Sequence, residues 1–126
     1  MDRVLLTCSY REDKQMNIQM TAGEALQAFC RAWFVERDVE AAMAFIREDV
    51  DFVGTGIGES ARGRDEMLSY LRQDMLEIPE PFTLLLTEIN EQVIAEHVRN
   101  LSAEVTLKNS VYTWHVRGFF TMVMEG

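Results

Sequence analysis

Between residues 21 and 78 the apolar positions recur with the period of amphipathic helices. Thr21 and Glu24 stand in a capping-box arrangement, which satisfies free N–H groups in the first turn of a helix. The first apolar stripe follows it at helical spacing, on Leu26, Phe29, Cys30, Trp33 and Phe34. Two more stripes follow Asp38 and Gly63, on Val39, Ala42, Met43 and Ile46, and on Met67, Leu68, Leu71 and Met75. The pattern predicts three helices, the last of them ended by two prolines.

After residue 81 the apolar period changes to two. Residues 101–108 alternate apolar and polar positions, which is typical of a half-buried strand, and residues 82–89 and 111–124 also predict strands. Residues 4–6 suit a short strand within an N-terminal extension that covers residues 1–20. Three helices followed by antiparallel strands predict an α+β domain over residues 21–126. In this domain the helices pack on one face of a curved antiparallel sheet.

A short strand at residues 50–55 leads into a turn that is rich in glycine. Four glycines occur there, and they permit positive φ and close backbone approach: Gly54, Gly56, Gly58 and Gly63. A phosphate-binding loop would need the P-loop or dinucleotide pattern within a βαβ unit, and neither is present. The turn therefore indicates a feature of the scaffold.

Composition and charge narrow the classes of partner. The chain has 126 residues, of which 48% are hydrophobic, and its formal net charge is -9. Clustered Lys and Arg are absent, so we do not expect a nucleic-acid partner. The sequence shows no signal peptide and no apolar run near the ~20 residues that span a bilayer. With two cysteines outside any CxxC motif, these features predict a cytoplasmic protein with reduced thiols and no membrane partner.

A distinctive run follows the first two predicted helices and leads into the third. It consists of Asp51-Phe-Val-Gly-Thr-Gly, then Glu59, then Gly63-Arg-Asp-Glu. Together with the long strands, it resembles the SnoaL-like branch of the nuclear transport factor 2-like superfamily. It is particularly similar to modules at the N-terminus of bacterial signalling proteins. The resemblance implies a cone-shaped half-barrel with an apolar pocket between helices and sheet, usually dimerising through the sheet. Enzymes and binding modules share this fold, so the resemblance leaves both functions open.

Two departures from the family pattern affect the interpretation. The family usually adds one more strand after the one that matches residues 111–124. We therefore expect a truncated module, or a sheet completed by residues 1–10 or by a partner chain. The ketosteroid isomerase relatives place a general-base Asp where Gly54 stands in this chain. An isomerase mechanism needs such a base aimed into the pocket, so this departure favours binding.

Aromatic residues are the candidates for a pocket wall, although they could instead fill the core. The expected wall consists of Trp33, Phe52, Thr55, Tyr70, Trp114 and Phe119. The catalytic candidates are His115 as an acid or base, and Arg117 or Tyr70 as a group that stabilises an enolate. The roles of His115 and Arg117 require that the face of the last strand that bears them is concave. We favour the alternative, in which that pair faces solvent or a dimer partner.

Asp51 and Glu59 flank the glycine turn and could pair at the mouth of the cavity, but loop capping or solvation is the favoured interpretation. His97 and His115 lack metal-ligand spacing on one element, so we expect neither a metal nor a cofactor. The favoured function is a non-catalytic binding or sensory module for a small apolar molecule, acting as a homodimer. The alternatives are a cyclase, isomerase or dehydratase acting on a polyketide- or steroid-like substrate, and a dimerisation module with a filled cavity.

Overall fold

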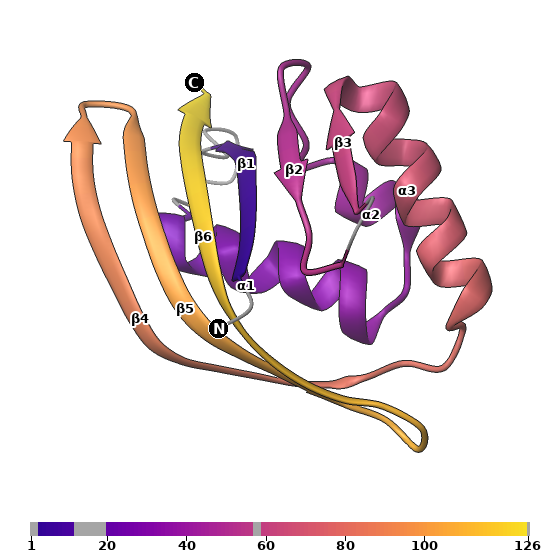
Figure 1. Ribbon diagram of the computed structural model, residues 1–126. Coiled ribbons are helices and arrows are strands. Elements are labelled where there is room, and N and C mark those ends of the chain that lie inside the picture. Colours follow the sequence, from indigo (N-terminus) through magenta and orange to yellow (C-terminus); the bar gives the residue numbers. More distant parts are fainter. Residues whose placement is uncertain (1–2, 12–19, 57–58, 126) are drawn as a thin grey trace.

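The helices of this computed structural model cover one face of a curved sheet of six strands (Figure 1). The structure describes residues 3–11, 20–56 and 59–125, and the expectations for the other residues, including Gly58, lie outside it. The helical segments are α1 (Ala22–Cys30), the π-helical η1 (Arg31–Val35), α2 (Val39–Met43) and α3 (Gly63–Glu77). The strands are β1 (Arg3–Arg11), β2 (Asp51–Val53), β3 (Ser60–Arg62), β4 (Thr83–Ala95), β5 (Val98–Lys108) and β6 (Thr113–Glu125). The α+β class and the curved sheet are confirmed.

The helices begin where the sequence predicts. Thr21 and Glu24 form the capping box at the start of α1, with both of its hydrogen bonds at 3.1 Å. Asp38 caps α2 by accepting the N–H of Ala41 at 3.1 Å. The second helix is shorter than its apolar stripe, because α2 ends at Met43 and Ile46 forms an isolated bridge with Cys8 of β1. Contact with the sheet therefore replaces the last predicted turn of this helix.

The strands follow the order β3-β2-β1-β6-β5-β4. All pairings are antiparallel except that of β1 with β6, which is parallel from Arg3–Arg117 to Arg11–Glu125. The N-terminal strand β1 thus lies beside β6 and extends the sheet there, which is one of the alternatives that the sequence left open. Strand β4 is longer than predicted, and a bulge near Glu88, whose φ is +50°, lets it follow the curve of the sheet.

The hydrophobic core fills the space between the helices and the concave face of the sheet. The predicted alternation on β5 is confirmed, because its apolar members are buried: Leu101, Ala103, Val105 and Leu107. The helices contribute Leu26, Phe29, Met67 and Leu71, each fully buried. Across the described ranges, no helix is both long and apolar enough to pass through a membrane.

Candidate ligand-binding pocket

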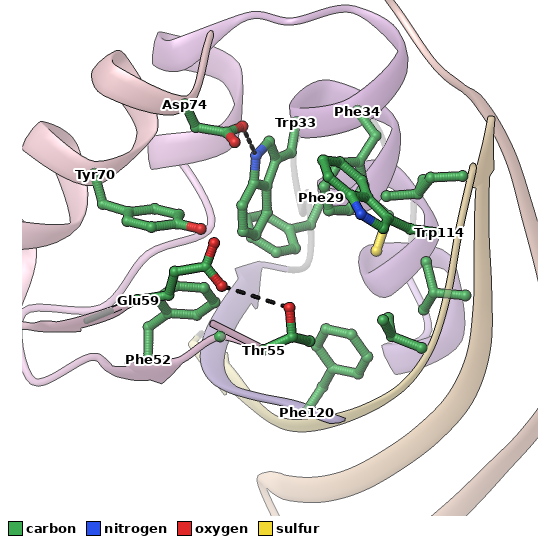
Figure 2. Close-up of a pocket in the computed structure, with 15 residues that line it drawn as sticks. Phe29, Trp33, Phe34, Phe52, Thr55, Glu59, Tyr70, Asp74, Trp114 and Phe120 are labelled. Carbon is green, nitrogen blue, oxygen red and sulfur yellow. Dashed lines mark hydrogen bonds between the residues drawn. The ribbon is translucent and has the colours of Figure 1, made fainter. Parts of the chain in front are cut away.

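A cavity of about 100 Å³ lies between the helices and the concave face of the sheet (Figure 2). Its wall is mostly aromatic and aliphatic, with contributions from Phe29, Cys30, Trp33, Phe34, Phe52, Tyr70, Val105, Leu107, Trp114, Val116 and Phe120. Its polar groups come from Thr55, Glu59 and Asp74. Apolar cavities of about 150 Å³ accept benzene, so this smaller space accepts a group smaller than a benzene ring without rearrangement.

The π-helical segment η1 supplies two neighbouring rings to the wall. Its wider turn is closed by the N–H of Glu36, which donates to the carbonyl oxygen of Arg31 at 2.8 Å. Trp33 and Phe34 both line the cavity, and their rings stack with centroids 4.5 Å apart. Trp33 Nε1 donates to Asp74 Oδ2 at 2.9 Å. This bond fixes the indole between η1 and α3.

Asp74 is occupied by structural partners. Besides the indole of Trp33, its carboxylate pairs with Arg37, at 3.2 Å between Nη2 and Oδ2. The Arg37 side chain is only 6% exposed, and its guanidinium also donates to three carbonyl oxygens, those of Trp33, Asp74 and Ile78. Arg37 itself has a φ of +52°. The Asp74 charge is thus balanced by Arg37 inside the protein.

Glu59 supplies the second carboxylate in the wall, from the glycine turn. It accepts hydrogen bonds from the backbone N–H of Gly56 and from Thr55 Oγ1, the latter at 3.4 Å. A Cβ at Gly54 would lie 2.8 Å from Glu59 Cβ, and one at Gly56 would lie 2.9 Å from Glu59 Cδ. Both glycines therefore make room for this side chain. Among the described glycines of the turn, positive φ occurs at Gly63 alone, at +82°.

Tyr70 stands at the same end of the cavity, on α3. Its ring contacts those of Phe52 and Trp33, with centroids 4.8 and 6.2 Å apart. Burial raises the pKa of the Tyr70 hydroxyl well above its ordinary value, and the negative charge of Glu59 adds to the rise. The hydroxyl therefore stays protonated at neutral pH and can donate to a ligand.

Comparison with known protein families identifies the scaffold. The model of the SnoaL-like domain matches residues 23–125, which is most of the chain. The chain belongs to the SnoaL-like family. Among solved structures, it is similar to an NTF-2 like protein of unknown function from Shewanella oneidensis MR-1, with 16% identity and a TM-score of 0.52. That alignment covers 79% of this chain and 94% of the other, and at such identity it shows the fold alone.

A comparison of this SnoaL-like domain with curated protein sequences gives no match. Its site must therefore be interpreted from its own residues. Five of the six expected wall residues line the cavity: Trp33, Phe52, Thr55, Tyr70 and Trp114. The sixth, Phe119, is outside the cavity wall, because alternate residues of β6 point to opposite faces and Phe120 takes the inner position.

The same alternation places His115 and Arg117 of the SnoaL-like domain on the outer face of the sheet. His115 hydrogen-bonds to Thr106 at 2.8 Å through Nδ1 and lies 2.9 Å from Glu104 Oε2 through Nε2. Arg117 Nη1 donates to Glu104 Oε1 at 2.7 Å. Two of the three catalytic candidates are therefore outside the cavity, and only Tyr70 remains in its wall.

Sequence reasoning assigned Glu59 to capping of the loop, whereas the structure gives it a place in the cavity wall as well. Asp51, its suggested partner, lies elsewhere and is 3.8 Å from Arg62. The sequence signal for this role was a carboxylate five residues after Gly54. The sequence could not show that Glu59 reaches the cavity, because the direction of its side chain depends on how the turn closes.

Two further chemistries can be assessed for the SnoaL-like domain. Cys30 reaches the cavity wall, and burial raises the pKa of its thiol to about 12, so it is protonated and a poor nucleophile at neutral pH. Within the part of the chain that the structure describes, no cluster of three or more His, Cys, Asp and Glu side chains could hold a metal ion. Hydrogen bonding and proton transfer by Glu59 and Tyr70 are the chemistry that the wall can supply.

Proposed function

We propose that this SnoaL-like domain is a non-catalytic binding or sensory module for a small, mostly apolar molecule. One observation carries the proposal: an aromatic cavity with two polar side chains, Glu59 and Tyr70, at one end. Ligand sites generally combine an apolar wall with a few polar groups that fix orientation. The size of about 100 Å³ favours a ligand, or the end of a ligand, no larger than one ring.

The proposal extends to the cellular role. A cytoplasmic homodimer formed through the outer face of the sheet would connect two cavities, and ligand binding could pass through it to a signalling partner. The resemblance to modules of bacterial signalling proteins supports this role. Exposed apolar side chains on that face, Leu85 and Phe119, suit such an interface.

Cavity filling tests the binding function. A thermal-shift screen of small metabolites should reveal ligands that raise the melting temperature, since they bind the native state. Val116→Phe places a larger side chain in the cavity wall and should abolish the shift. Val93→Phe makes the same change at an exposed position of β4 outside the wall and should preserve it. Hits that survive Val116→Phe, or the absence of any hit, would contradict a ligand in this cavity.

A small enzyme is the second candidate, and one observation favours it. Glu59 supplies a carboxylate at the end of the cavity where Tyr70 supplies a protonated hydroxyl, as proton abstraction next to a carbonyl requires. The cavity is smaller than one that accepts benzene, so a steroid would enter only in part. This candidate predicts deuterium exchange at the α-carbon of acetone, followed by NMR. Glu59→Gln should slow it by about 100-fold or more, and His115→Ala should leave it unchanged.

A further inference from the structure

We propose that the cavity selects a small organic ammonium group, in preference to neutral or anionic groups of the same shape. This inference rests on the proposed binding function and names its ligand class. The supporting features are the charge of the wall, the arrangement of its rings and the size of the space.

The charge of the wall favours a cation. The described residues that line the cavity include two carboxylates, Glu59 and Asp74, and no Lys, Arg or His. Arg37 balances Asp74 from behind, at 3.2 Å. Glu59 has only neutral partners among the described residues, the N–H of Gly56 and the hydroxyl of Thr55. One negative charge that no cation of the described wall balances therefore remains at the cavity, on a side chain that is partly buried.

The rings add to this preference. Trp33, Phe52 and Tyr70 form a cluster in which each pair of rings has centroids between 4.8 and 6.2 Å apart and planes inclined by 52–90°. Rings inclined to one another present both faces and edges around a shared space. The face of an aromatic ring attracts a cation, and tryptophan gives the strongest attraction.

The competing ligand classes lack one or both of these interactions. A carboxylate or phosphate would be repelled by Glu59 and would find no cation in the described wall. A neutral alcohol could donate to Glu59, but it would gain neither the charge attraction nor the interaction with the rings. Burial is the main cause of the raised pKa of Tyr70, and the negative charges of Glu59, Asp74 and Glu77 add to it.

The size of the space limits the ammonium group. A volume of about 100 Å³ is below that of cavities known to accept benzene, which measure about 150 Å³. A primary amine on a short carbon chain is smaller than benzene and fits, a trimethylammonium group is about as large as benzene and sets the upper limit, and a long amine would extend toward solvent. The structure thus favours a methylated or short-chain ammonium compound.

Isosteric ligands test the charge directly. Isothermal titration of the full chain would compare choline with 3,3-dimethylbutan-1-ol, in which carbon replaces nitrogen, and with 3,3-dimethylbutanoate. Tetramethylammonium and benzylammonium would cover smaller and larger cations. We expect at least one cation to bind tenfold or more tightly than the neutral alcohol, and the anion not to bind. Equal affinity for the alcohol, or no binding of any of the three cations, would overturn the inference.

Variants identify the group responsible. Glu59→Gln keeps an acceptor for the N–H of Gly56, so it should weaken cation binding tenfold or more and change alcohol binding little. Glu91→Gln removes one charge from an exposed position of β4 and serves as the control. Equal loss with both variants, or with neither, would refute a role for Glu59.

A second substitution keeps the test independent of the loop. Tyr70→Leu removes one ring of the cluster from a partly buried position on α3, so cation binding should weaken more than alcohol binding. If the alcohol and the cations bind equally and Val116→Phe blocks both, the binding function stands and the ammonium inference fails. If no ligand shows binding that Val116→Phe blocks, both proposals fail.

Discussion

Strand β6 separates two environments that differ in how their polar groups are paired. On its outer face, His115 and Arg117 share Glu104, so the charges there satisfy one another. On the inner face, Trp114 and other apolar side chains border a cavity whose carboxylate Glu59 has only neutral partners within the described part of the chain. The outer face has more titratable groups, yet the proposed binding group lies on the inner side. How a charge is paired therefore distinguishes the two faces better than the number of charges does.

The largest expected difference between the faces is in packing. Phe120 on the inner face is 5% exposed, whereas its neighbour Phe119 on the outer face is 36% exposed. Phe120→Ala should lower the free energy of unfolding by about 4 kcal/mol, because it leaves a cavity in the core. Phe119→Ala should lower it by less than about 1 kcal/mol at protein concentrations where the chain is monomeric. Urea denaturation measures both, and similar losses would contradict the assignment of the faces.

Ion pairs should differ in the same direction. Arg37→Met should cost about 3 kcal/mol of stability, because it leaves Asp74 and three carbonyl oxygens without their buried partner. Arg117→Met makes the same change on the outer face, where the side chain is 20% exposed, and should cost much less. Chemical denaturation of the two variants provides the measurement. A larger loss for Arg117→Met would mean that the outer network, rather than the inner one, stabilises the fold.

Gly118 permits a sharper test of the inner face. A Cβ at this position would lie 2.4 Å from the ring of Phe120, so the ring covers the glycine directly. Gly118→Ala should displace that ring and cost about 2 kcal/mol, as overpacking does. The same displacement should reduce the cavity and weaken ligand binding. An alanine variant with unchanged stability and affinity would show that the ring has room to move.

The smallest effect should appear on the outer face at acid pH. The hydrogen bond from Arg117 holds the pKa of Glu104 below its ordinary value of 4.5, with a further contribution from His115. The stabilisation is therefore complete above pH 4.5 and disappears as the pH falls through the lowered pKa. Unfolding measured from pH 7 to pH 3 should show a shallower acid loss in Glu104→Gln than in the wild type. An identical slope would exclude a contribution from this carboxyl group.

Much of the fold could be predicted because its signals are local. The capping box at Thr21 and the alternation on β5 depend on neighbouring residues, and both are confirmed. The π-helical turn at η1 and the position of β1 beside β6 depend on distant parts of the chain. Alternation showed that Trp114 and His115 face opposite ways, but the helices decide which face is inside. Both faces are partly apolar, so the pattern could not make that choice.

The close contact between Gly54 and Glu59 implies a relation between the residues at positions 54 and 59. Since Glu59 occupies the space that a side chain at position 54 would need, this scaffold has room for a single carboxylate there. Related chains should therefore carry an acidic residue at position 54 or position 59 and a small residue at the other of the two. During evolution the carboxylate could then come from either position, while its place in the pocket stays the same. An alignment of relatives should show this exchange as covariation between the two positions.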